Sequence, residues 1–274
     1  MKKPFSCHAV RRSTEGSTFL AGCKSRFLAS LGMTVMVAAL LACGAPQEGG
    51  SVSIPRSTLV VGIDVSGSFG KNYESSIDFT ANYIYAHIHG LGGLKQPTAV
   101  FVGSIGGEHP QETKSFQPIE TFQNMSVTEI AKYLRKEYPN RDGLTDFNPF
   151  FSRVATLVTR QNLVLAPLNI VLVTDGIPDT PAAKNDSLGK YKKIDVSKLE
   201  YLSKNVTVRV LYPRPTIAVR WEKQVPRHRV RMWTVDDEVM ATWKNHYHAG
   251  QPAAEQSELW EWIAHNVDFR VRSI

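Results

Sequence analysis

Oxygen-bearing side chains with the spacing of a metal site follow the apolar run at residues 58–63. The segment Asp64-Val-Ser-Gly-Ser68 places one carboxylate and two hydroxyls at alternate positions. The apolar run before it has the composition of a strand that is buried on both faces. Carboxylate and hydroxyl oxygens are ligands that hard divalent cations prefer. The segment therefore forms half of a candidate cation site.

The other half lies far downstream, as Thr145 in the loop 142–146 and as Asp175 at the end of the apolar run 170–174. Asp64 and Asp175 each follow an expected parallel strand, and the carboxyl ends of parallel strands meet at one edge of a sheet. Thr145 precedes an expected helix beside them. Three hydroxyls and two carboxylates suit Mg²⁺, which takes oxygen ligands and usually keeps waters.

The order D-x-S-x-S, then Thr, then Asp resembles the metal-ion-dependent adhesion site (MIDAS) of von Willebrand factor type A (vWA) domains, and Gly143-Leu-Thr145 also fits that pattern. The resemblance implies that Ser66, Ser68 and Thr145 bind Mg²⁺, or Mn²⁺ or Ca²⁺, directly. Asp64 and Asp175 would bind it directly or through water. In this family a protein partner presents an acidic side chain to the open position on the metal.

Other chemistry fits the same residues less well. A phosphate-binding loop would need Gly where Val65 stands and Ser or Thr where Asn72 stands. No general base can be placed near the site from the sequence, so we expect a binding domain and not an enzyme. Two alternatives stay open: a metal-dependent enzyme or its regulatory subunit, and a scaffold domain without metal.

Apolar runs alternate with segments of helical period after residue 57, which predicts an α/β fold. We expect a doubly wound, mostly parallel sheet of about six strands flanked by helices. The expected strands are residues 59–63, 98–103, 112–116 (an edge strand), 169–174, 206–212 and 230–235. The expected helices are 72–89, 126–136, one capped by Asp146, 196–203, 217–223, 236–247 and 255–266. The resemblance covers about residues 58–250, and residues 268–273 have no expected role.

The N-terminal residues have the features of an export signal. Lys24 and Arg26 precede the apolar stretch 27–42, which ends at Cys43. The sequence Leu40-Leu-Ala-Cys43 resembles the lipobox of bacterial lipoproteins, which implies lipidation of Cys43. An uncleaved anchor or an ordinary signal is the alternative. Gly44, and not Asp, follows the cysteine, which in Gram-negative lipoproteins implies sorting to the outer membrane. We therefore expect a lipid-anchored protein of the bacterial cell envelope.

This interpretation divides the chain into a signal peptide (1–43), a flexible Gly/Pro/Ser-rich linker (44–57) and a vWA-like domain with a C-terminal helical extension (58–274). All three cysteines lie in residues 1–43. Removal of the leader leaves 26 basic and 24 acidic residues, a net charge of +2. The basic pI therefore belongs mostly to the leader, and we expect no nucleic-acid partner.

A basic segment lies near the C-terminal third of the chain. Its cations are a possible patch for anionic lipid, lipopolysaccharide or an acidic partner: Arg220, Lys223, Arg227, Arg229 and Arg231. The alternation in residues 227–233 equally suits a strand with one solvated face.

Histidines and tryptophans fit structural roles. His87 and His89 end an expected helix, where cationic side chains favour the helix dipole. Trp243, Trp260 and Trp262 have apolar neighbours at helical spacing, so we expect them in the core.

Overall fold

The computed structural model describes residues 57–106, 115–180 and 189–269. The expected signal peptide, its Cys43 and nearly all of the expected linker lie outside these ranges. Among the helices of the described ranges, none has the length and apolar character needed to cross a membrane.

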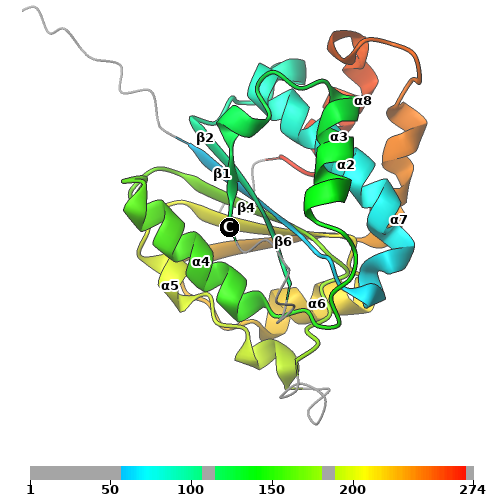
Figure 1. The fold of residues 1–274 in the computed structure, drawn as a ribbon. Helices are drawn as coiled ribbons and strands as arrows, with labels where there is room; N and C mark the ends of the chain where they lie inside the picture. The colour runs from blue at the N-terminus through cyan, green and yellow to red at the C-terminus, as the bar shows by residue number, and fades with distance from the viewer. Residues whose placement is uncertain (1–56, 107–114, 181–188, 270–274) are drawn as a thin grey trace, which may run out of the picture. The chain divides into compact units, whose positions relative to one another are not determined.

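A single sheet of six strands forms the centre of the domain, in the order β3-β2-β1-β4-β5-β6 (Figure 1). The strands are β1 (Thr58–Ile63), β2 (Ala99–Ser104), β3 (Gln117–Pro118), β4 (Leu168–Val173), β5 (Val206–Leu211) and β6 (Val230–Val235). All pairings are parallel except that of β3 with β2. The strand order reverses at β1, between β2 and β4, which is the switch point of a doubly wound sheet. The predicted fold class is therefore confirmed.

Helices cover both faces of the sheet: α4, α5 and α6 on one, and α2, α3, α7 and α8 on the other (Figure 1). Their bounds are α2 (Gly70–His89), α3 (Val127–Glu137), α4 (Phe147–Arg160), α5 (Ser197–Glu200), α6 (Pro215–Gln224), α7 (Asp237–Ala241) and α8 (Ser257–Asn266). Short 3-10 turns occur at Gly67–Phe69, Leu91–Gly93, Ile119–Thr121, Lys190–Lys193, Thr242–His246 and Ala253–Glu255.

Two hydrophobic cores result, one on each face of the sheet. Alternate residues of β1 enter different cores, because successive side chains of a strand point to opposite faces: Val61 packs in one and Val60 in the other. This explains why every residue of β1 is buried. Gly62 allows close packing here, since a Cβ at this position would lie 2.6 Å from the Phe150 ring of α4. Among the described residues, all members of both cores lie between Leu59 and Val267, so this part of the chain contains its own hydrophobic cores, as an independently folding domain does.

Some elements differ from the sequence-based prediction. The edge strand expected at 112–116 falls partly outside the described residues, which resume at 115; residues 115 and 116 are not in a strand, and the antiparallel edge strand is β3, Gln117–Pro118. Pro118 lacks an N–H to donate, which helps to end the pairing with β2 after two residues. The helix expected at 236–247 is α7 followed by a 3-10 turn, and the one expected at 196–203 is reduced to α5.

The C-terminal extension belongs to the core. Trp260 and Ile263 of α8 are buried with Trp243 and Trp262, as the prediction for the tryptophans required. After α8, the carbonyl of Val267 accepts a 2.7 Å hydrogen bond from the buried Arg209 of β5. These contacts fix a segment for which the sequence suggested no role.

A buried polar cluster joins the extension to α2. The Asp268 carboxylate accepts a 2.7 Å hydrogen bond from Tyr83 and lies 2.6 Å from Nε2 of His87. His87 is only 7 % exposed, so it does more than favour the helix dipole: it pairs with a distant carboxylate.

Candidate metal-binding site

Backbone hydrogen bonds join the three loops that carry the candidate ligands. Asp142 donates to Val65 O and accepts from Gly67 N, each at 3.0 Å, which ties the loop before α4 to the loop after β1. Thr145 and Asp179 exchange a second pair, at 3.1 and 3.0 Å, which ties the same loop to the one after β4. The loops that hold Asp64, Thr145 and Asp175 therefore meet at the carboxyl edge of the sheet.

Asp64 is fully buried and held at both oxygens. Its Oδ1 accepts a 2.9 Å hydrogen bond from Ser66 N, and its Oδ2 accepts a 2.5 Å bond from Thr174 Oγ1. Burial raises the pKa of Asp64 to about 7, because the hydrogen bonds only partly offset the loss of water, and the nearby Asp175 charge raises it further. A cation near this carboxyl would favour its charged form.

Ser66, Ser68 and Asp175 form a connected group. The two serine hydroxyls lie 3.1 Å apart, and Ser68 also hydrogen-bonds the carboxylate of Asp175. The Asp175 carboxylate also accepts a 2.9 Å hydrogen bond from Ile177 N. Burial raises the pKa of Asp175, although hydrogen bonds and the positive charges of Lys190 and Arg214 act in the opposite direction.

Thr145 differs from Asp142 and Asp146 in the same loop in the hydrogen bonds that its side chain makes. Asp146 caps α4 by accepting a 3.0 Å hydrogen bond from Asn148 N. Asp142 accepts a 3.2 Å bond from Leu144 N. Thr145 is fully buried, and its Oγ1 has no hydrogen-bond partner within the described part of the chain. An unpaired buried hydroxyl is unfavourable, so this oxygen has unused capacity to bind a ligand.

These residues fit a hard cation. Adjacent ligands of an octahedral Mg²⁺ with bonds of about 2.0–2.1 Å lie about 2.9 Å apart, close to the 3.1 Å between the two serine hydroxyls. No group of three His, Cys, Asp or Glu side chains able to hold a metal occurs among the described residues. Within the described ranges, a metal at this edge would therefore take hydroxyl ligands together with carboxylates.

Residues outside the predicted set support the site. Thr174 holds Asp64, and its Oγ1 also accepts a 2.9 Å hydrogen bond from Gly176 N. Gly176 has a φ of +72°, and its carbonyl accepts a 2.7 Å bond from the Trp221 indole. A Cβ at Gly176 would lie 2.7 Å from that indole nitrogen. Thr174-Asp-Gly is a common strand-to-turn sequence, so the sequence alone did not indicate that Thr174 and Gly176 support the site.

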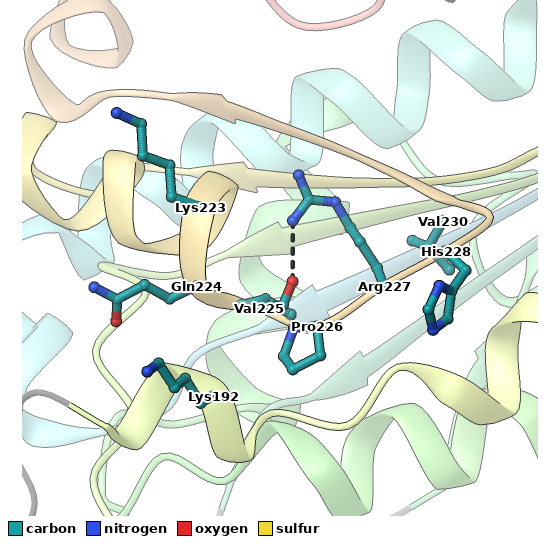
Figure 2. Close-up of a pocket in the computed structure, with 8 residues that line it drawn as sticks. All are labelled: Lys192, Lys223, Gln224, Val225, Pro226, Arg227, His228 and Val230. Atoms are coloured by element: carbon teal, nitrogen blue, oxygen red, sulfur yellow. Dashed lines mark hydrogen bonds between the residues drawn. The ribbon is translucent and has the colours of Figure 1, made fainter.

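The predicted basic patch is divided in the structure. Arg220 lies over the ring of Tyr191, with its guanidinium carbon 5.7 Å from the centroid. Lys223 and Arg227 line a shallow depression of about 580 Å³ next to α6 (Figure 2). Arg229 and Arg231 are exposed, and Arg231 lies between the buried residues Val230 and Met232, so this end of β6 has the solvated face that the alternation indicates.

No protein-family model matches the sequence, and no curated protein sequence matches it either. Among solved structures, the SpRpn10 VWA domain is similar at 13% identity and a TM-score of 0.39, over 74% of this chain and 94% of that one. Proximal thread matrix protein 1 from the mussel byssus is similar at 13% identity and a TM-score of 0.38, over 76% of this chain and 47% of that one. The pilus adhesin SpaC from Lactobacillus rhamnosus GG is similar at 18% identity and a TM-score of 0.31, over 46% of this chain and 15% of that one.

At these scores the likenesses add nothing about ligands or partners. The fold class comes from the sheet itself: five parallel strands, an antiparallel edge strand and helices on both faces. This is the doubly wound sheet that the resemblance to type A domains implies.

Proposed function

We propose that this chain is a lipid-anchored, vWA-type protein of the bacterial cell envelope. Its domain binds Mg²⁺, or Mn²⁺ or Ca²⁺, and through the metal it holds an acidic side chain of a protein partner. The observation that carries the proposal is the buried, unpartnered hydroxyl of Thr145, in a loop that is hydrogen-bonded to both loops with the other candidate ligands.

The roles of the residues follow from their chemistry. Ser66, Ser68 and Thr145 would bind the cation through neutral oxygens, and Asp64 and Asp175 would supply the negative charge. The formal charge of two carboxylates equals that of a divalent cation in size. Both carboxylates, however, already accept hydrogen bonds from protein groups. When bound, the metal supplies a positive centre that attracts a carboxylate of the partner.

The enzyme alternative has less support. A carboxyl with a pKa of about 7 has the acidity of a general base, and Asp64 meets that condition. However, Asp64 is fully buried and both of its oxygens accept hydrogen bonds from the protein itself. These contacts favour binding as the role of the site.

The test is thermal unfolding of residues 50–274 in EDTA and with each ion. A ligand at a hundred times its dissociation constant stabilises the native state by about 2.7 kcal/mol, which corresponds to about 5–10 °C for a domain of this size. Asp175→Ala should abolish the shift. Asp146→Asn is the matched control in the same region, because asparagine also caps helices and the shift should persist.

The outcomes separate the three functions. A shift that Asp175→Ala removes would support the metal site and justify a metal-dependent search for the partner. The same shift together with hydrolysis of model substrates would favour the enzyme. No shift of the unaltered protein with any ion would contradict the metal site and leave the scaffold domain.

A further inference from the structure

Four loops meet at the amino ends of the parallel strands, on the edge of the sheet opposite the candidate metal site. We call this surface the basal edge; it comprises residues 95–98, 161–167, 201–205 and 225–229, with Ser57 and the end of α4. Leu165 N donates to Leu202 O at 2.7 Å, and Leu168 N donates to Asn205 O at 2.9 Å. In Figure 1, α4 ends and β1 begins on this same side of the sheet.

Large apolar side chains project from the basal edge into solvent. Leu165 is 74% exposed and Tyr201 is 79% exposed, and Val164 is 40% exposed. The hydrogen bond from Leu165 to Leu202, the residue after Tyr201, brings the two loops together. Leu165 also has a φ of +75°, a left-handed conformation that is unfavourable for leucine. An exposed leucine held in such a conformation is a candidate for a functional role.

The basal edge also carries cations. Arg160, Lys204 and Arg229 are exposed and Arg227 is partly exposed. The four loops contain no Asp or Glu. The nearest carboxylate along the chain, Glu200, is 4% exposed and accepts a 2.7 Å hydrogen bond from His228 N. The basal edge therefore combines exposed apolar side chains with an excess of positive charge.

The depression beside this edge does not form a compact anion pocket. In Figure 2, the cationic ends of Lys192, Lys223 and Arg227 do not converge on one point, and the Arg227 guanidinium donates a 3.1 Å hydrogen bond to Val225 O. Cations that spread over a surface suit an extended anionic surface better than one small anion. We therefore consider an extended anionic surface, and not a small anion, as the ligand of the basal edge.

The start of the described chain lies at the same edge. Ser57 O accepts a 2.8 Å hydrogen bond from Thr98 N, and Thr58 N donates to Pro167 O at 2.8 Å. Cys43 is fourteen residues upstream, and the flexible linker that the sequence predicts there would span about 20 Å. A lipid on Cys43 would therefore keep the basal edge within reach of the bilayer.

We propose that the basal edge docks on an anionic phospholipid bilayer. Leu165, Val164 and Tyr201 enter the headgroup region, and Arg160, Lys204, Arg227 and Arg229 bind lipid phosphates. Tyrosine and leucine beside basic residues are typical of surfaces at membrane interfaces. This docking needs neither the metal site nor the lipid on Cys43, so it can be tested without them.

The first test is sedimentation of residues 50–274 with vesicles at near-physiological salt. We expect binding to an equal mixture of phosphatidylglycerol and phosphatidylcholine, and much weaker binding to phosphatidylcholine alone. The double variant Lys204→Gln/Arg229→Gln should bind about 30-fold more weakly. Lys132→Gln/Lys136→Gln removes the same charge from exposed positions of α3 and should bind as the unaltered protein does.

Leu165→Asn tests the apolar contact. Asparagine accepts a positive φ, so the loop conformation is retained, but the affinity for anionic vesicles should fall about ten-fold or more. The far-UV spectrum and unfolding temperature of each variant show whether it is folded.

Insertion can be measured with a single fluorescent label, since residues 50–274 contain no cysteine. A label on Val164→Cys should shift to shorter wavelength when anionic vesicles are added, and a label on Lys132→Cys should not. No binding of the unaltered protein to anionic vesicles would overturn membrane docking and leave the basal edge for an acidic protein. Equal binding by Lys204→Gln/Arg229→Gln, or an unchanged label at position 164, would overturn it as well.

Discussion

At the residue scale, the spacing of side chains predicted which loops would meet but not how each residue is held. Asp64, Ser66, Ser68, Thr145 and Asp175 lie in loops that are joined by backbone hydrogen bonds, as a site at the carboxyl edge requires. The supporting role of Thr174 depends on a contact between residues 110 positions apart, which local sequence patterns do not encode. Metal binding itself stays a prediction.

Replacement of Thr145 by valine should have opposite effects with and without metal. In EDTA, Thr145→Val removes a buried unpaired hydroxyl while it keeps the shape, so the protein should gain about 1 kcal/mol and unfold about 2–4 °C higher. With Mg²⁺ the variant should show no further shift. Thr145→Ser keeps the hydroxyl and should retain the response. A destabilised Thr145→Val protein that still responds to Mg²⁺ would contradict the role assigned to Thr145.

The affinity for Mg²⁺ should depend on pH through Asp64. The pKa of this carboxyl is about 7 without metal, so below pH 7 the cation must displace a proton when it binds. The apparent affinity should fall about ten-fold for each pH unit below the pKa and level off above it. Calorimetric titration at several pH values would measure this slope and the proton release. A flat affinity across this range would show that Asp64 is already ionised.

At the element scale, hydrophobic patterns predicted most strands and helices well, because β1, β2, β4 and β5 are buried on both faces and each long helix has an apolar stripe. Ser126-Val-Thr-Glu129 has the sequence pattern of a capping box, and that box is present at the start of α3. The patterns failed where long-range contacts decide the structure. Asp268 and Tyr83 are 185 positions apart, and no local signal indicates that residues 267–269 pack against α2 and β5.

The contact between the C-terminal segment and α2 should weaken in acid. Burial opposes ionisation of Asp268, but the electrostatic attraction and hydrogen bond of His87, together with Arg209 and Tyr83, hold its pKa below the usual range. The stability contributed by a lowered pKa is present above the unfolded-state value, about 4, and is lost as the pH falls through the folded value. Near pH 7, Asp268→Asn should cost roughly 2 kcal/mol, or about 4–8 °C.

Unfolding temperatures of both proteins from neutral to acid pH would measure this effect, and the difference between them should shrink as the pH falls. Glu258→Gln is the control. Its carboxylate lies 3.3 Å from His248 in an exposed pair, so the change should cost less than about 0.5 kcal/mol. A constant difference between Asp268→Asn and the unaltered protein across the pH range would show that the ionised form of Asp268 is not what stabilises the contact.

At the scale of the whole molecule, the sheet separates the two proposed binding surfaces. The candidate metal site lies at the carboxyl ends of the parallel strands and the basal edge at their amino ends. Strands of six residues separate the two by about 20 Å. A domain docked through its basal edge would therefore point the metal site away from the bilayer, where a partner could reach it. The cations of the basal edge can be identified in the sequence, but the four loops of this edge come together only in the folded chain.

This separation predicts that the two surfaces act independently. Sites that share no partners and lie more than about 10 Å apart usually contribute additively. Leu165→Asn should therefore keep the full metal-dependent rise in unfolding temperature, and Asp175→Ala should keep its affinity for anionic vesicles. The double variant should lose both responses by the amounts measured in the single variants. A metal ion that changes vesicle binding of the unaltered protein but not of Asp175→Ala would instead show that the two edges are coupled through the sheet.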